Sequence, residues 1–288
     1  MKPAPFDYVA AASADDAVRL LAEHGDEALI LAGGQSLVPM MNMRLARPTV
    51  LIDINDCDEM KFMRFEGSDG FAIGAGTRQK DILNSAEAKA AVPLLLKALA
   101  FVGHQQTRNR GTLGGSIAHG DPSAEMPLAA VTLDAAVTLR SSRAERQIAA
   151  SEFYSGPMST ERRADECLMA VSFPHTPGAG TGFHEVSERH GDFAIVSAAA
   201  EISLDGGKCT AAAIGIGGAH PYPVKARKAE AILIGEVPTD ALVEAAAEAA
   251  TDGIEAMDDV HATAAYRMRV ARVLAARAIA DAIAGAKS

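Results

Sequence analysis

The sequence predicts an α+β fold of more than one domain, and three observations lead to this prediction. Up to Phe173, short β-branched or apolar runs alternate with helical patterns. The segment HTPGAGTG, residues 175–182, gathers Pro and Gly without periodicity, which is typical of a linker. Beyond it, two apolar runs flank the turn Asp205-Gly206-Gly207, and helical patterns follow. A chain of 288 residues can form two or three small cores, so we place a domain boundary in residues 175–182 and expect a small antiparallel sheet with helices after it.

Capping and turn residues set the first elements. Ser13, with acids in the turn after it, begins a helix that ends at Gly25. A strand over 29–31 leads to a glycine turn, and Ser36 is the expected cap of the next helix. The other strands are expected at 50–54, 71–77, 131–139, 168–173, 195–204 and 209–216, and the other helices within 81–101 and over 224–234, 239–251 and 263–286.

Two glycine pairs are the strongest functional signal. Gly33-Gly34 lies in LILAGGQSLVPMM and Gly114-Gly115 lies in RNRGTLGGSIAHGDPSAEMP, and we expect each pair where an apolar strand turns. A Gly-Gly turn lets backbone N–H groups approach an anion, and a following helix N-terminus adds partial positive charge. The two loops together predict two halves of a cradle for a diphosphate, to which the second adds the polar side chains of Thr112, Ser116 and Asp121.

The glycine pairs also have an ordinary interpretation, because an isolated Gly-Gly is more often a tight turn without a ligand. The chain lacks both a G-x-G-x-x-G with an acid about 20 residues on and a G-x-x-x-x-G-K-[ST] loop. Any nucleotide must therefore be held by a fold other than the Rossmann or P-loop folds.

Charge and cysteine usage exclude several classes of function. A net charge of −10 argues against nucleic acid or an anionic membrane as the main partner. No 18 apolar residues run together, so we expect no membrane span and a cytoplasmic protein. Cys57, Cys167 and Cys209 stand far apart, so we expect no metal site. We assign no catalytic residue, because His104 and His119 have no identifiable nucleophile or acid partner.

Two long segments carry a family resemblance. AGGQSLVPMMNMRLARPTVLIDIN at 32–55 and RNRGTLGGSIAHGDPSAEMP at 108–127 resemble the FAD-binding medium subunit of the molybdenum hydroxylases. That family includes carbon monoxide dehydrogenases, xanthine dehydrogenases and bacterial hydroxylases of N-heteroaromatic compounds. The likeness extends over the chain, through PAPFDY near the start, RHGDFAIVSAAAEI at 189–202 and DGGKCTAAAIGIGG at 205–218. The TLGGS sequence looks closest to the subunits that serve nicotine-like or quinoline-like substrates.

The resemblance implies a fold and a set of domains. The FAD-binding domain would be two-lobed, of the p-cresol methylhydroxylase/CO-dehydrogenase flavoprotein type, over residues 1–176, with lobes at 1–56 and 57–176. A CO-dehydrogenase-flavoprotein-like α+β domain would follow at 177–288.

Site residues are also implied by the resemblance. Glu125 matches an acid that contacts the ribose, and Val102 and Leu168 match apolar contacts to the flavin. Phe193 stands where relatives often carry the Tyr of GDYA, and it would keep the stacking surface over the flavin. The residues implied around the diphosphate are Ile30, Leu31, Ala32, Gly33, Gly34, Gln35, Ser36, Leu37, Gly111, Thr112, Gly114, Gly115 and Ser116, the last in place of the Asn of TIGGN.

The implied function is electron transfer within an oxidoreductase complex. Hydroxylation would take place at the molybdenum cofactor of a large partner subunit. Electrons would then pass through the [2Fe-2S] clusters of a small partner subunit to noncovalent FAD in this chain, and on to an external acceptor. Two alternatives stay open at this point, a self-sufficient FAD-dependent oxidase or dehydrogenase of a small molecule and a non-catalytic scaffold subunit.

Overall fold

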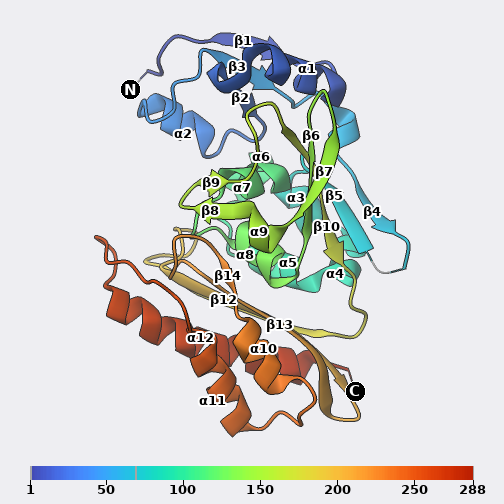
Figure 1. Cartoon of the computed structure of the whole chain (residues 1–288), viewed down its shortest axis with the longest axis vertical. Helices are drawn as coiled ribbons and strands as arrows, with labels where there is room; N and C mark the ends of the chain where they lie inside the picture. The colour runs from blue at the N-terminus through green and yellow to red at the C-terminus, as the bar shows by residue number, and fades with distance from the viewer. Residues whose placement is uncertain (1, 69, 288) are drawn as a thin grey trace.

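Three main sheets follow one another along the long axis of the molecule in the computed structural model, which describes residues 2–68 and 70–287 (Figure 1). A three-stranded sheet lies at the top of this view, a five-stranded sheet with short helices in the middle, and a four-stranded sheet with the last helices at the bottom. The structure confirms a fold that mixes helices and sheets, with a small antiparallel sheet in the C-terminal part.

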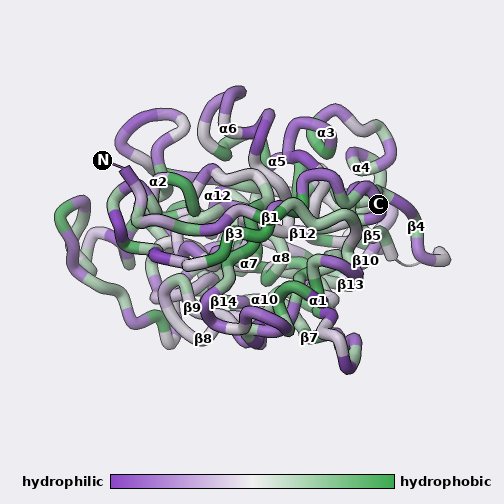
Figure 2. Tube along the Cα trace, turned by 90° about the horizontal axis from the view of Figure 1, so that it is seen from above, coloured by the Kyte–Doolittle hydropathy of each residue, from purple (hydrophilic) through white to green (hydrophobic). Residues whose placement is uncertain are grey.

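The first sheet is parallel, in the order β1 (Asp7–Ala10), β3 (Val50–Asp53), β2 (Ala28–Leu31). Helix α1 (Ala14–His24) packs on it, and the Ser13 hydroxyl accepts a hydrogen bond from the Asp16 N–H at 3.1 Å, which confirms the expected cap. A single 3₁₀ turn, η1 (Gly25–Glu27), follows α1, and α2 (Leu37–Asn42) follows β2. Seen from above this end, hydrophobic β3 runs through the centre, whereas hydrophilic α6 lies at the rim (Figure 2).

The second sheet is antiparallel, in the order β4-β5-β10-β6-β7. Its strands share one apolar core with the first sheet, because buried Leu21 and Ile52 belong to the same cluster as Phe71, Leu95 and Val171. The strands are β4 (Met63–Glu66), β5 (Gly70–Gly74), β6 (Ala136–Arg140), β7 (Glu145–Ala149) and β10 (Cys167–Pro174), and a small hairpin is formed by β8 (Tyr154–Gly156) and β9 (Ser159–Thr160). The helices of this part are η2 (Asp58–Met60), α3 (Gln79–Leu83), α4 (Ala86–Ala91), α5 (Pro93–Leu99), α6 (Gln105–Arg110), α7 (Leu113–His119), α8 (Glu125–Thr132) and α9 (Ala150–Phe153).

The third sheet is antiparallel and covered on both faces. Its order is β11 (Gly180–Val186), β12 (Val196–Asp205), β13 (Lys208–Gly217), β14 (Val224–Lys225), and the hairpin predicted at residues 205–207 is confirmed. Ala198 and Ala200 belong to a second core with α10 (Arg227–Leu233), α11 (Asp240–Ala249) and α12 (Ala264–Gly285). Ala199, which points to the opposite face, belongs instead to the first core, where α5 and α8 pack.

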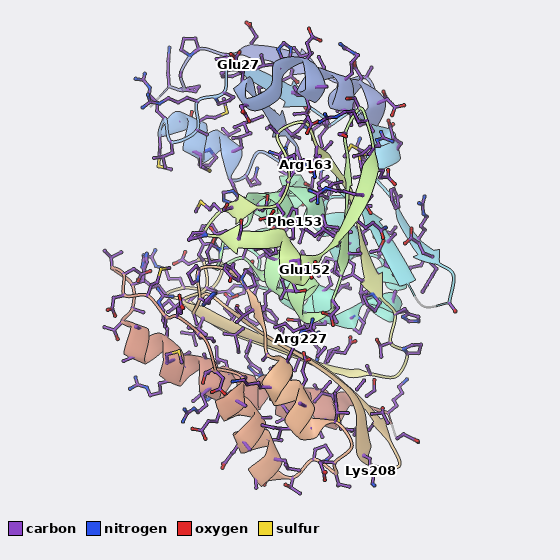
Figure 3. The ribbon with its side chains drawn as sticks, viewed as in Figure 1. Glu27, Glu152, Phe153, Arg163, Lys208 and Arg227 are labelled. Atoms are coloured by element: carbon purple, nitrogen blue, oxygen red, sulfur yellow. The ribbon has the colours of Figure 1, made fainter. Side chains whose placement is uncertain are left out.

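Two glycines in β13 allow α8 to pack closely on this sheet. A Cβ atom at Gly215 would meet the Thr132 hydroxyl, and one at Gly217 would lie 3.2 Å from Leu128. A polar contact also joins α8 to this sheet, because the Lys225 ammonium of β14 donates a hydrogen bond to the Thr132 carbonyl at 2.8 Å. Arg227, labelled in Figure 3, stands where the C-terminal helices meet the middle of the molecule.

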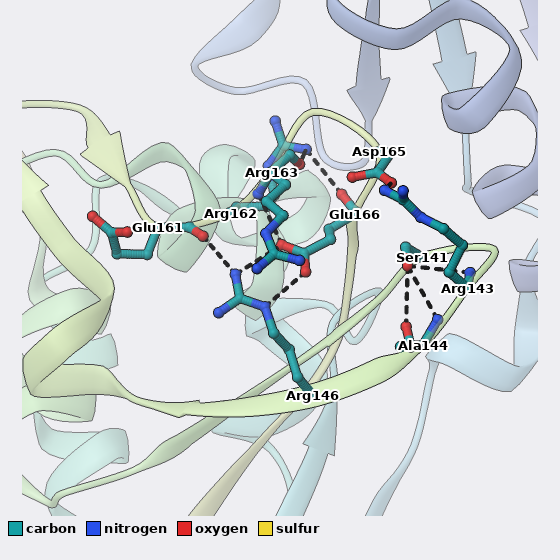
Figure 4. A network of polar contacts seen from close by, with 9 residues as sticks. All are labelled: Ser141, Arg143, Ala144, Arg146, Glu161, Arg162, Arg163, Asp165 and Glu166. Atoms are coloured by element: carbon teal, nitrogen blue, oxygen red, sulfur yellow. Dashed lines mark hydrogen bonds and ion pairs between the residues drawn. The ribbon is translucent and has the colours of Figure 1, made fainter.

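A buried carboxylate fixes the loop between β9 and β10 (Figure 4). Glu166 is 3% exposed and accepts two hydrogen bonds from the Arg146 guanidinium, at 2.7 and 2.9 Å. The Arg163 N–H donates to it at 2.8 Å, and Arg162 donates to the Glu166 carbonyl. The bidentate pair lowers the pKa of Glu166 and ties the residue before β10 to β7, across the intervening strand β6.

Three local predictions are wrong. Residues 131 and 132 end α8, residues 133–135 turn, and the strand begins only at Ala136. All eight residues of α8 are buried, so the helix has no exposed polar face and its apolar run at 128–131 resembles a strand. The second glycine pair follows helix α6, not a strand, and lies inside α7. Ser36 precedes α2 as expected, but its side chain makes no capping hydrogen bond.

The connection between β10 and β11 spans residues 175–179 and is shorter than the linker predicted over 175–182, because residues 180–182 already pair with β12. The division of the chain into domains 1–176 and 177–288, with lobes at 1–56 and 57–176, stays a prediction, and residues 1 and 288 lie outside the described residues.

Candidate cofactor-binding site

The two glycine loops touch each other through backbone atoms. A Cβ atom on Gly33 would lie 2.5 Å from the Arg110 carbonyl oxygen and 2.8 Å from Gly111 Cα. Ala32 and Gly115 also approach, since a Cβ on Gly115 would lie 3.8 Å from that of Ala32. The structure therefore brings together the residues at 32–36 and 111–116 that the sequence singled out.

The first loop presents backbone donors without acceptors. Across residues 2–68 and 70–287, no acceptor is found for the backbone N–H groups of Gly33, Gly34, Gln35 and Ser36. Gly34 has φ +71°, which glycine adopts without strain, and the Gln35 amide donates back to the Gly33 carbonyl at 3.1 Å. Four successive unpaired N–H groups in a loop are typical of an anion-binding site.

The second loop uses its backbone donors internally. Leu113 N–H donates to the Thr77 carbonyl at 3.1 Å, and Gly114 N–H donates to the Ala75 carbonyl at 3.0 Å. Gly115 N–H donates to the Thr112 hydroxyl at 3.0 Å, which caps α7. A Cβ on Gly114 would meet the backbone of Ala75, so this glycine is required for packing. Ser116, partly exposed beside them, can still offer its hydroxyl.

The other predicted contacts lie on three further segments. Val102 is partly buried before α6, and its carbonyl accepts from Arg108 at 2.7 Å. Phe193 is 67% exposed, in a loop whose Gly191 lies so near His104 that a Cβ would stand 2.6 Å from its Cε1. The Phe193 loop is thus held beside the segment that follows Val102.

Leu168 and the residues flanking the first loop have apolar neighbours. Leu168 is buried in β10, opposite Leu139 of β6, and β10 packs against α7, the helix that carries the second glycine pair. Ile30 is partly buried on β2, and Leu37 begins α2. Leu31 packs under the turn, with its Cδ1 atom 3.2 Å from where a Cβ on Gly34 would stand.

Glu125 opens α8 as a buried acid. It is 6% exposed, and burial raises the pKa of its carboxyl to about 7. Glu185 of β11 lies near enough to sense it, because burial and then the charge of Glu125 raise the pKa of Glu185 to about 8. The Glu185 Oε2 atom is buried without a hydrogen-bond partner among the described residues. Both side chains are suited to hold a proton near neutral pH.

Sequence reasoning missed Arg78. Its guanidinium donates to the Arg110 carbonyl oxygen and to the Asn55 side-chain oxygen, so it joins the second glycine loop to the end of β3. The only sequence signal is an arginine after an apolar strand, and such a residue is usually exposed.

Three further observations bear on what the chain binds. No helix within the described ranges is long and apolar enough to cross a membrane. No cluster of three metal-ligating side chains occurs in that part of the chain. The unpaired donors of the first loop, the polar side chains of the second and a cation at their junction fit the diphosphate of a dinucleotide such as FAD.

Comparisons with known proteins agree with this chemistry. Residues 4–176 match the family described as FAD binding domain in molybdopterin dehydrogenase, and residues 181–282 match the CO dehydrogenase flavoprotein C-terminal domain. The 6-hydroxypseudooxynicotine dehydrogenase complex subunit alpha of Paenarthrobacter nicotinovorans is 41% identical, over 98% of this chain and 96% of that relative.

Two solved structures share the whole fold. Carbon monoxide dehydrogenase from Hydrogenophaga pseudoflava superposes with a TM-score of 0.97 at 35% identity, covering 100% of both chains. Quinoline 2-oxidoreductase from Pseudomonas putida 86 gives a TM-score of 0.93 at 37% identity, covering 99% of both chains. With two matched domains and these relatives, the chain belongs to the family of FAD-binding medium subunits of the molybdenum hydroxylases, and it is an oxidoreductase subunit.

Proposed function

We propose that this subunit relays electrons through a noncovalently bound FAD, from the iron–sulfur clusters of a partner subunit to an external acceptor. The observation that carries the proposal is the run of four unpaired N–H groups at Gly33, Gly34, Gln35 and Ser36. When bound, FAD supplies the ability to accept and release electrons.

The chain's own residues hold and orient the cofactor in this proposal. The first loop binds the diphosphate through its N–H groups, and Thr112 and Ser116 border it on the other side. Glu125 accepts a hydrogen bond from the ribose, while Val102, Leu168 and Phe193 provide apolar surface for the flavin. The support is the contact between the two loops and the position of the Phe193 loop against His104.

The partners follow from the relatives. One relative carries the name of a dehydrogenase complex subunit. We propose that this chain likewise works with a large molybdopterin-binding subunit and a small [2Fe-2S] subunit. Its location in the cytoplasm stays a prediction.

The test compares the isolated chain with the chain copurified with its partner subunits. We expect both to show a flavin spectrum, and acid precipitation to release free FAD. An N-heteroaromatic substrate should reduce the flavin only in the complex. Substrate-dependent reduction in the isolated chain would favour a self-sufficient oxidase, and absence of flavin after incubation with FAD would favour a scaffold. Flavin that stays on the denatured chain would contradict noncovalent binding alone.

A further inference from the structure

Arg78 stands on the segment that shapes the second glycine loop. Residues 75–79 run antiparallel to residues 111–114, with a bridge between Arg78 and Thr112. The Gln79 N–H donates to the Gly111 carbonyl at 2.9 Å, next to this bridge. The backbone of Arg78 is therefore fixed directly beside Thr112 of the second loop.

The side chain of Arg78 joins three segments. One arm of the guanidinium binds the Arg110 carbonyl oxygen, and another binds the Asn55 side-chain oxygen. Asn55 is itself held by Asp53, which accepts its side-chain amide at 2.6 Å and its N–H at 2.7 Å. The Arg110 carbonyl oxygen is also the atom that a Cβ on Gly33 would meet first, so the guanidinium lies at the junction of both glycine loops.

The charge of Arg78 has no ion-pair partner within the described parts of the chain. Its two acceptors are neutral, and no carboxylate oxygen lies within 4.0 Å of it. Burial lowers its pKa, as does the charge of Arg110, whereas the charges of Asp81 and Asp53 act in the opposite direction with smaller effect. A partly buried cation without a counter-ion is costly unless an anion binds beside it.

We propose that Arg78 is a positioning residue of the FAD site, which sets the separation of the two glycine loops by binding Asn55 and the Arg110 carbonyl at once. This inference rests on the proposed FAD site. The planar guanidinium reaches two acceptors on different segments with fixed geometry, whereas a lysine ammonium is a point charge that does not reproduce this fork. The FAD site therefore requires the fixed geometry of these two guanidinium hydrogen bonds and not only the positive charge.

The experiment uses apoprotein of the full chain and the variants Arg78→Lys, Arg78→Gln and Asn55→Ala. Arg143→Gln is the matched control, because Arg143 is exposed and pairs with Asp165 away from the loops. FAD and ADP share the diphosphate, so we expect both Arg78 variants to weaken both ligands by about 10- to 100-fold. Asn55→Ala, which keeps the charge, should weaken both ligands in the same direction. Adenosine, which lacks phosphate, should bind all variants equally.

Each outcome decides the proposal. Wild-type affinity in Arg78→Lys would mean that charge alone suffices, and wild-type affinity in Arg78→Gln would mean that the residue has no role. Equal loss of adenosine binding would indicate general damage to the fold and would also overturn it. If Arg78→Gln does not fold, Arg78→Lys and Asn55→Ala still decide. Wild-type apoprotein that binds neither FAD nor ADP would refute the FAD site itself, a result distinct from any variant effect.

Discussion

The two glycine loops each contain a Gly-Gly pair and touch each other, yet they use their backbone N–H groups differently. In the first loop the backbone donors from Gly33 to Ser36 are free, and Gly34 takes a left-handed conformation. In the second, the donors of Leu113, Gly114 and Gly115 are already bound within the chain. Both pairs permit close packing, Gly33 against the Arg110 carbonyl and Gly114 against Ala75, but only the first also leaves its N–H groups open to a ligand. A glycine pair thus indicates close approach of the backbone, and only its hydrogen-bond partners show what approaches.

The largest expected effect is a loss of protein stability when a glycine of the second loop is replaced. Gly114→Ala places a Cβ against the backbone of Ala75, so we expect the free energy of unfolding to fall by about 1–3 kcal/mol. Urea denaturation of the apoprotein measures this. Gly285→Ala is the control, because this glycine also lies in a helix and a Cβ there would meet nothing closer than Gly180 Cα at 3.6 Å. Equal stability of Gly114→Ala and wild type would contradict the packing role of the second loop.

The second effect should appear in ligand affinity. Gly34→Ala strains a left-handed residue by about 1–2 kcal/mol and tilts the neighbouring N–H groups, so FAD should bind about tenfold more weakly. Gly206→Ala introduces the same strain at φ +55° in the distant β12–β13 turn, where nothing lies within 4 Å. Titration of both apoproteins with FAD makes the comparison. Equal affinity in the two variants would show that the first loop does not bind the diphosphate.

The acid at the start of α8 should make FAD binding depend on pH. Burial raises the pKa of Glu125 to about 7 in the free protein. A ribose hydroxyl donates to the ionised form, so it lowers this pKa and binding releases a proton. Affinity should therefore increase as pH rises toward about 7 and become constant above it, and Glu125→Gln should remove the slope. Isothermal titration at several pH values measures it, and an unchanged slope in the variant would place Glu125 outside the site.

The smallest effect should come from the side chain of the second loop. Ser116→Ala removes a hydroxyl worth about 0.5–1.5 kcal/mol to a bound ligand, so FAD should bind about 2- to 10-fold more weakly. Apoprotein stability should not change, because the Ser116 hydroxyl makes no hydrogen bond within the described residues. Lower stability without a change in FAD affinity would mean that Ser116 supports the fold and does not contact the ligand.

Local signals in the sequence predicted much of the fold. The Ser13 cap and the turn at Asp205-Gly206-Gly207 act through neighbouring residues, and the structure confirms both. The error at 131–135 has a different origin, because α8 is enclosed by the first core and by β13 and lost the polar face that marks a helix.

The candidate site was predictable only in part for the same reason. The glycine pairs can be read directly from the sequence. The role of Arg78, in contrast, depends on pairing between residues 75–79 and 111–114, which are far apart in the sequence. The close approach of the Arg110 carbonyl to Gly33 is equally non-local. Such contacts arise from tertiary packing, and no local propensity encodes them.

The close packing of α8 on Gly215 and Gly217 has a consequence for how the protein unfolds. The four-stranded sheet gives one face to the C-terminal helices and the other to α5 and α8, so neither core is complete without it. The two halves should therefore unfold together in one cooperative transition, and a chain truncated in the β10–β11 connection would expose the apolar sides of α5 and α8 to solvent. Any hinge that admits a cofactor has to lie elsewhere than at this sheet.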